Sequence, residues 1–296
     1  MSPKYLIMDV TGGLGRSILT NLLKLVPASE IAVSSSKATF AAEFEALGVQ
    51  FRAIDFSDGS RLKKAFTGVE RLFFVSTDTF DHAKRINQHR NVVEPAKTAN
   101  VGHVYYSSLA FGGFGDSKVE LQLAHSATER MLRESGITYM SVRMGIYADA
   151  FPCFLNWYPT DPNQNLYFPS SGSIAYASRE GLGEATAKLM VAGGHENEIV
   201  LLTSPRAHTL IDMVHAVNET IGHNVTVEFV DDDEYRAFFR GWTSLFAGLA
   251  QGEAATVSPP MSELLGREAK DGVQMVKELL SNDRDYKWHQ NYAKKD

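Results

Sequence analysis

The sequence is short of three features that would each point to a particular class of protein. It has a single cysteine, Cys153, in 296 residues, so no disulfide can form within the chain. Acidic residues (35) outnumber Lys and Arg (29), giving a net charge of −6, whereas sequence-independent binding of nucleic acid needs a basic face. No apolar run approaches the roughly 18 residues of a membrane helix, and no signal-peptide pattern opens the chain. We therefore expect a cytoplasmic protein with no nucleic-acid partner and no membrane segment.

What the sequence does contain is enough apolar material for a large core. Hydrophobic residues make up 44% of the chain and charged residues 22%, which is close to the average of globular proteins. The length is about twice the ~150 residues that is a rough guide for one domain. It therefore allows one large domain, or a large domain with a smaller one.

The first half of the sequence alternates between two hydrophobic periods. Short apolar runs suited to strands buried on both faces are separated by segments with apolar residues at helical spacing. The runs lie at residues 5–10, 31–33, 49–54, 72–75, 103–107 and 137–142. Strands that alternate with helices predict βαβ units with right-handed crossovers. We expect an α/β protein with a Rossmann-like, doubly wound parallel sheet over residues 1–150.

The second half is less regular. Residues 151–172 carry four prolines among aromatic residues and predict a loop or a lid. Helices are expected at 179–190, 209–221 and 231–249, and strands at 198–202 and 225–230. Thr209 is the candidate N-cap of the second of these helices, with Asp212 in the capping-box position. We expect residues 151–296 to form a smaller mixed α/β substrate domain, some segments of which return to the main sheet.

A glycine-rich turn joins the first expected strand to the first expected helix. Its residues Gly12, Gly13, Leu14 and Gly15 predict a site where backbone amides at a helix N-terminus hold the diphosphate of a dinucleotide. If Gly12 and Gly15 are the last two glycines of a Gly-x-x-Gly-x-x-Gly pattern, Asp9 stands at the first, where a carboxylate would repel a phosphate. A one-residue shift of the loop is the alternative register. The glycines could also simply shape a strand-to-helix turn.

Residues that follow other strands extend this candidate site. Ser36 and Lys37 come after the second strand, where an acidic residue would bind the ribose of NAD and a basic one suits the 2′-phosphate of NADP. This favours NADP (NADPH), although a solvated turn that opens the next helix is an equal interpretation. Ser76 follows the fourth strand and could contact a cofactor ribose.

Several stretches, taken in order, resemble the NmrA-like branch of the atypical short-chain dehydrogenases, and within it the quinone oxidoreductase and triphenylmethane reductase type. The most specific is the run at 88–93, and the runs at 11–15, 125–132 and 142–147 also match. The resemblance implies a Rossmann domain, a small C-terminal domain and a substrate cleft. It also implies NAD(P)H-dependent reduction, or dinucleotide sensing without catalysis. The sequence departs from the family at Asp9, at Met144 and Ala150, where relatives have asparagine, and at Gly181, where an aspartate is usual. Met144 completes the candidate cofactor-binding set.

The candidate catalytic residues are His125 and Tyr147. No Tyr-x-x-x-Lys motif occurs, so the proton relay of ordinary short-chain dehydrogenases is absent. His125 falls in the helix where this fold places its catalytic residues and matches a family histidine, and histidine is suited to proton transfer near neutral pH. Tyr147 follows the sixth strand, at the sheet edge where ligands bind. A helix-surface position for His125 and a packing role for Tyr147 are the alternatives.

We therefore hypothesise an NAD(P)H-dependent oxidoreductase that reduces a quinone-like or conjugated carbonyl substrate. The first alternative is a non-enzymatic NAD(P) sensor that acts through a regulatory protein partner. The second is a cofactor-independent lyase, isomerase or cyclase, or a binding protein. A homodimer is compatible with each hypothesis. No metal site is expected, because the histidines lack zinc-like spacing and no second cysteine exists.

Overall fold

The structure is a computed structural model that describes residues 3–79, 81–231, 233–235 and 243–288. The chain forms two compact units. The first unit comprises residues 1–109, 121–144 and 179–200, and the second comprises residues 110–120, 145–178 and 201–296. The first unit thus takes in residues 179–200, which follow the predicted division at residue 150. That division stays a prediction.

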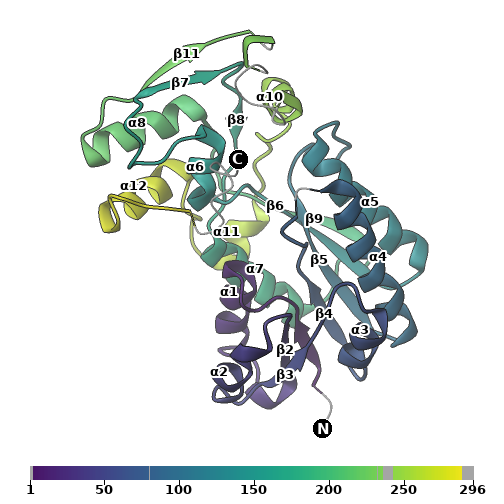
Figure 1. The fold of residues 1–296 in the computed structure, drawn as a ribbon. Helices are drawn as coiled ribbons and strands as arrows, with labels where there is room; N and C mark the ends of the chain where they lie inside the picture. Colours follow the sequence, from purple (N-terminus) through teal and green to yellow (C-terminus); the bar gives the residue numbers. More distant parts are fainter. Residues whose placement is uncertain (1–2, 80, 232, 236–242, 289–296) are drawn as a thin grey trace. The chain divides into compact units, whose positions relative to one another are not determined.

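A seven-stranded sheet in the order β3-β2-β1-β4-β5-β6-β9 forms the centre of the first unit (Figure 1). All neighbouring pairs from β3 through β6 are parallel. The strands are β1 (Tyr5–Ile7), β2 (Ile31–Ser35), β3 (Gln50–Ala53), β4 (Arg71–Phe74), β5 (His103–Leu109), β6 (Tyr139–Met144) and β9 (Glu198–Leu202). This order is that of the Rossmann fold, so the predicted fold class is confirmed.

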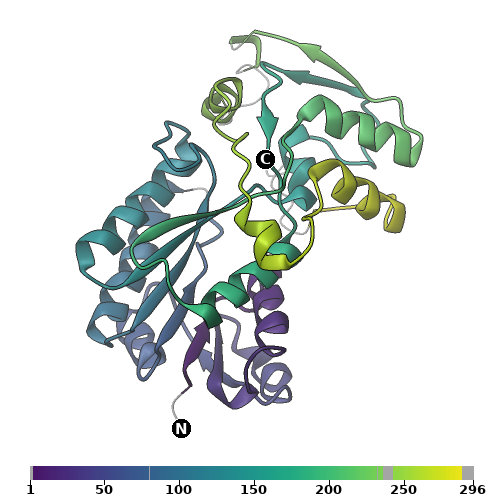
Figure 2. The same ribbon diagram turned by 180° about the vertical axis from the view of Figure 1, so that it is seen from behind.

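Helices cover both faces of this sheet, as the two opposite views show (Figures 1 and 2). One face carries α1 (Gly13–Leu22), α2 (Ala41–Glu45) and α7 (Arg179–Ala192). The other face carries α3 (Gly59–Phe66), α4 (His82–Thr98) and α5 (Glu120–Ser135). Because both faces are covered, the strands β1, β2 and β6 are buried at every position, which explains their continuous apolar runs.

One glycine in a helix interior lets two helices of the first face approach closely. An added Cβ on Gly183 of α7 would lie 2.1 Å from the Ser17 hydroxyl oxygen of α1. The Ser17 hydroxyl donates a hydrogen bond of 3.3 Å to the Glu180 carbonyl. The first turns of α1 and α7 are therefore held against each other.

The second unit is built from short elements. Its two small sheets pair β7 (Asn165–Phe168) with β11 (Thr226–Phe229) in parallel, and β8 (Ser173–Ile174) with β10 (His208–Thr209) antiparallel. Its helices are α6 (Phe151–Leu155), α8 (Leu210–Ile221), α10 (Thr243–Ala250), α11 (Pro260–Leu265) and α12 (Gly272–Asn282). The predicted capping box is present, because the Thr209 hydroxyl accepts from the Asp212 amide and the Asp212 carboxylate accepts from the Thr209 amide.

The structure differs from the sequence-based expectation in two places. Residues 151–172 are not only a loop, because they contain α6 and β7. Pro152 lies in the first turn of α6, where proline has no amide to lose, so its presence does not exclude a helix. The first strand ends at Ile7 instead of Val10, because Asp9 turns the chain with a φ of +51°. Part of the helix expected at 231–249 lies outside the described residues, and α10 accounts for its end.

No helix among the described residues is long and apolar enough to span a membrane.

Candidate functional site

The candidate site lies where the strand order of the main sheet reverses. β1 stands between β2 and β4, so the chain proceeds to one side of β1 first and to the other side later. In doubly wound sheets ligands bind outside the carboxyl ends of the strands at such a switch point. The glycine turn follows β1, and the segment with Ser76 follows β4. The topology therefore brings these two predicted segments to the same edge of the sheet.

The conformation of the turn decides between the two glycine registers. Asp9 has a φ of +51°, the left-handed region, and its carbonyl accepts a 3.0 Å hydrogen bond from the Gly12 amide. An added Cβ on Gly15 would lie only 2.6 Å from the Asp9 carbonyl oxygen, so only glycine fits there. Asp9 thus occupies the place of the first glycine in the Gly-x-x-Gly-x-x-Gly pattern. Aspartate is one of the few residues that tolerate this conformation, at a cost of about 1 kcal/mol.

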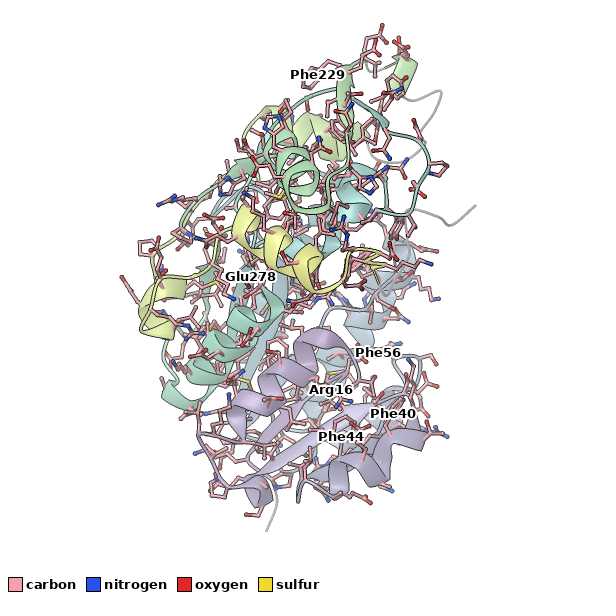
Figure 3. The ribbon with its side chains drawn as sticks, turned by 90° about the vertical axis from the view of Figure 1, so that its left-hand side faces the viewer. Arg16, Phe40, Phe44, Phe56, Phe229 and Glu278 are labelled. Atoms are coloured by element: carbon pink, nitrogen blue, oxygen red, sulfur yellow. The ribbon has the colours of Figure 1, made fainter. Side chains whose placement is uncertain are left out.

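The first turn of α1 offers its amide groups to an external acceptor. Gly12 is the N-cap residue, and within the described chain no side chain caps the helix. The first four N–H groups of a helix have no partner inside it, and together with the helix dipole they favour an anion. The side chain of Arg16 points toward α2, where it pairs with Glu43 at 2.7 Å and lies over the Phe44 ring (Figure 3). Arg16 is therefore engaged away from the turn.

A second arginine does lie beside the turn. Arg179, the first residue of α7, places a guanidinium nitrogen 3.0 Å from the position that a Cβ on Gly13 would take. Its approach depends on the close packing of α1 on α7 at Gly183. The prediction from sequence did not include Arg179. The sequence signal that could have indicated it is Gly183, a glycine inside the helix that begins at Arg179.

The segment after β2 is joined to the turn by a short hydrogen-bond chain. The Thr11 and Ser35 hydroxyls lie 3.1 Å apart, and the Lys37 amide donates to the Ser35 hydroxyl at 3.1 Å. Ser36 and Lys37 are exposed, and the charge of Lys37 acts on Asp9. The structure thus brings the predicted adenosine-side residues Ser36 and Lys37 next to the predicted diphosphate turn.

A buried histidine holds the segment after β4. The Thr77 amide donates to His89 Nε2 at 3.2 Å, so Nε2 is an acceptor and the ring proton is on Nδ1. Nδ1 then donates to the Thr128 hydroxyl at 2.7 Å, and that hydroxyl donates to the Ala124 carbonyl at 3.0 Å. Burial, and after it the charge of Arg85, lowers the pKa of His89 to about 3. His89 is therefore a neutral ring with a fixed proton order.

The predicted catalytic residue His125 lies in the same buried region. Its Nδ1 is 2.8 Å from the Tyr106 hydroxyl and its Nε2 is 3.5 Å from an Arg85 nitrogen. Burial is the main cause that lowers the pKa of His125 well below its ordinary value, and the Arg85 charge adds to it. The His125 ring is thus neutral and 7% exposed, and it does not lie on the helix surface. Of these two partners only the Tyr106 hydroxyl can exchange a proton with His125, because the Arg85 guanidinium stays protonated.

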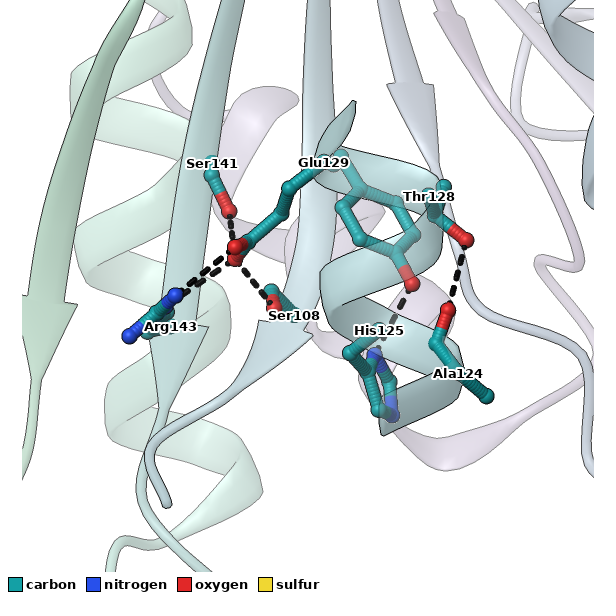
Figure 4. Close-up of polar contacts among 8 residues, drawn as sticks. Ser108, Ala124, His125, Thr128, Glu129, Ser141 and Arg143 are labelled. Carbon is teal, nitrogen blue, oxygen red and sulfur yellow. Dashed lines mark hydrogen bonds and ion pairs between the residues drawn. The ribbon is translucent and has the colours of Figure 1, made fainter. Parts of the chain in front are cut away.

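An ion pair lies next to this region, between α5 and β6 (Figure 4). Arg143 donates to Glu129 through Nε at 3.0 Å and through a terminal nitrogen at 2.7 Å. The Ser108 and Ser141 hydroxyls donate to Glu129 Oε1 at 2.7 and 2.6 Å. Burial raises the pKa of Glu129, but the donors from Arg143 and Ser141 outweigh it, so the pKa is lowered and the carboxylate is charged. The pair fixes α5 to the ends of β5 and β6.

The remaining predicted residues follow β6. Met144 is the last residue of β6, is buried, and pairs in register with Leu109 of β5. Tyr147 is partly buried in the second unit and forms an isolated parallel bridge with Ala177. Among the described residues no group of three or more His, Cys, Asp and Glu side chains could hold a metal ion.

Similarity to known proteins identifies the family of this chain. The sequence profile of the NmrA-like family matches residues 1–245. The chain is 44% identical to the NmrA-like family domain-containing oxidoreductase flvB of Aspergillus flavus, over 99% of this chain and 100% of that protein. Among solved structures it is similar to the NADPH-dependent quinone oxidoreductase QOR2 of Escherichia coli complexed with NADPH (TM-score 0.81, 28% identity, 93% of this chain and 99% of that one). It is also similar to the Citrobacter triphenylmethane reductase complexed with NADP(H) (TM-score 0.78, 27% identity, 93% and 100%). The chain belongs to the NmrA-like family.

Proposed function

We propose that this chain is an NADPH-dependent oxidoreductase that reduces a quinone-like or otherwise conjugated carbonyl substrate. The glycine turn is the observation that carries the proposal, because it places the uncapped first turn of α1 at the switch point of the sheet. The names of the relatives support the chemistry. They include an oxidoreductase at 44% identity and two reductases that were solved with NADPH or NADP(H).

The residues of the turn fit the diphosphate of a dinucleotide. Gly15 allows the chain to fold closely behind the helix start, and Gly13 is exposed at its front. Arg179 adds a positive charge beside Gly13, and a guanidinium is well suited to phosphate oxygens. Asp9 opposes an anion at this place while it is ionised.

The proposed contacts of the cofactor follow the edge of the sheet. The amides of Gly12, Gly13, Leu14 and Gly15 would hold the diphosphate. Ser36 and Lys37, the exposed residues after β2, would hold the 2′-phosphate. Ser76 after β4 would contact a ribose, and Met144 at the end of β6 would contact the nicotinamide end. NADPH, when bound, supplies the hydride for the reduction.

The protein's own chemical task is then to supply a proton to the reduced substrate. Tyr147, which is partly buried, is the proposed donor. His125 is the second proposed catalytic residue. As a buried and neutral ring it would orient the Tyr106 hydroxyl, 2.8 Å from its Nδ1, and would not release a proton itself. Quinones need only modest proton donation, so Tyr147 does not have to be strongly acidic.

The test is consumption of NADPH, followed by its absorbance, with a panel of acceptors. The panel contains a benzoquinone, a naphthoquinone, a triphenylmethane dye and, as a control, an isolated aliphatic ketone. We expect turnover with one or more of the conjugated acceptors and none with the ketone. Binding of NADPH without turnover of any acceptor would instead support a dinucleotide sensor with a protein partner. Failure to bind NADPH would overturn the proposal and favour cofactor-independent chemistry.

A further inference from the structure

Asp9 stands where the Gly-x-x-Gly-x-x-Gly pattern has its first glycine, so a side chain is present at a position that normally has none. Its backbone takes the left-handed conformation of the first glycine. One carboxylate oxygen lies 3.3 Å from the position that a Cβ on Gly12 would take, and the other accepts from the Thr11 hydroxyl at 3.4 Å. The carboxyl group therefore lies beside Gly12, the N-cap residue of α1.

The ionised form of the Asp9 carboxyl group would repel a diphosphate bound next to it. Both are anions, and a diphosphate on the first turn of α1 would lie beside the Asp9 carboxylate. The side chain has little freedom to leave, because it is partly buried and bonded to Thr11. A neutral carboxyl group removes this conflict, since it carries an O–H donor that matches a phosphate oxygen.

We infer that Asp9 takes up a proton from solvent when the dinucleotide binds, and then donates a hydrogen bond to the diphosphate as a carboxylic acid. The inference rests on the proposed function, because it needs a dinucleotide on the turn. It makes Asp9 a binding residue for the cofactor instead of an obstacle to it. It also makes the affinity for the cofactor depend on pH.

The groups around Asp9 are consistent with uptake of a proton. Burial is the main cause that raises the pKa of Asp9, and the Asp78 carboxylate after β4 adds to it. The Thr11 hydroxyl and the Lys37 charge after β2 act in the opposite direction but do not outweigh them. Arg179 lies on the Gly13 side of the turn, where it faces the diphosphate position. Like the Asp78 carboxylate, a diphosphate would add negative charge near Asp9 and so favour the protonated form more strongly.

The inference fixes the sign and the steepness of the pH dependence. Because the bound state holds the extra proton, affinity should fall as pH rises through the interval between the Asp9 pKa values of the free and the bound protein. In that interval the Kd should rise about tenfold per pH unit, which is the limit for one linked proton. Below the interval Asp9 is already neutral and the Kd should be flat.

Calorimetric titration with NADPH in two buffers of different ionisation enthalpy counts the protons taken up. The 2′-phosphate of NADPH also titrates near pH ~6, as phosphomonoesters do, so the Asp9→Asn variant is measured in parallel. We expect wild type to take up more protons than Asp9→Asn, by up to about one, over the pH range in which its Kd rises with pH. Asp9→Asn should bind more tightly than wild type at pH 8, with a Kd that changes less than about twofold with pH once the 2′-phosphate is accounted for.

Two further variants keep the result interpretable. Asp9→Gly suits the left-handed backbone and should fold at least as well as wild type, so it replaces Asp9→Asn if that variant unfolds. Glu70→Gln removes an exposed carboxylate that precedes β4, at the opposite edge of the sheet, and should retain the full proton uptake. Equal proton uptake by wild type and both Asp9 variants would overturn the inference but leave NADPH binding intact. Absence of NADPH binding by wild type and by every variant would instead overturn the proposed function.

Discussion

Lowering the pH from 8 to 5 should reduce the unfolding free energy, and His89 contributes a part that can be calculated. Burial lowers the pKa of His89 to about 3 in the folded protein, whereas an unfolded histidine has a pKa of ~6.5. Because the folded value is the lower one, the unfolded chain binds the proton first. The stability that His89 provides is therefore complete above pH ~6.5 and is lost progressively toward pH ~3.

The expected size of the effect follows from these two values. A pH of 5 is ~1.5 units below the pKa of His89 in the unfolded chain, so that imidazole is almost fully protonated. In the folded protein His89 is still neutral at this pH. Each pH unit of such a difference corresponds to ~1.4 kcal/mol, so His89 alone should cost about 2 kcal/mol between pH 8 and pH 5. His125, whose pKa is also lowered mainly by burial, should add a loss of the same sign.

Urea denaturation of wild type and His89→Gln at pH 8 and pH 5 measures this contribution. The variant should be less stable at pH 8, because it loses the hydrogen bonds to Thr77 and Thr128. Its decrease from pH 8 to pH 5 should nevertheless be smaller than that of wild type by about 2 kcal/mol. Parallel decreases in the two proteins would refute the conclusion that His89 is buried in its neutral form.

Three other substitutions test further parts of the account. Thr128→Val keeps the side-chain shape but removes the hydroxyl that accepts from the buried His89 N–H, so it should lower the unfolding free energy by about 1–3 kcal/mol in thermal denaturation. Thr128→Ser keeps the hydroxyl, and an equal loss of stability in that variant would contradict this explanation. Glu129→Gln leaves Arg143 without its charged partner and should cost about 3–5 kcal/mol in urea, whereas a loss below ~1 kcal/mol would mean that the pair is not desolvated. Arg179→Met should weaken NADPH binding about tenfold, while the matched Arg16→Met changes it less than about twofold; equal effects would remove Arg179 from the diphosphate site.

The parts of the fold that follow from local rules were predictable from the sequence. Apolar runs identify strands such as β2 and β6 because a sheet covered on both faces needs them. The capping box of Thr209 and Asp212 is a contact between residues three positions apart, so its spacing reveals it. The short helix α6 was missed because four prolines between 151 and 172 suggest a loop, although Pro152 stands in the first turn of the helix, which tolerates proline.

The candidate site was predictable only where it is contiguous in sequence. The spacing of its glycines predicts the glycine turn. Which residue takes the place of the first glycine depends on the left-handed backbone of Asp9, and residue types alone do not determine that conformation. Arg179 reaches Gly13 through the packing of two helices that are far apart in the chain. The fixed proton on His89 likewise depends on contacts that the tertiary structure makes with Thr77 and Thr128.

A crystal structure of the protein grown with NADPH would show whether a dinucleotide binds on the glycine turn even though Asp9 replaces a glycine there. We expect the diphosphate against the first amides of α1, with Arg179 and the Asp9 carboxyl group within hydrogen-bond distance of its oxygens. A cofactor bound elsewhere, or no cofactor at millimolar NADPH, would contradict this expectation.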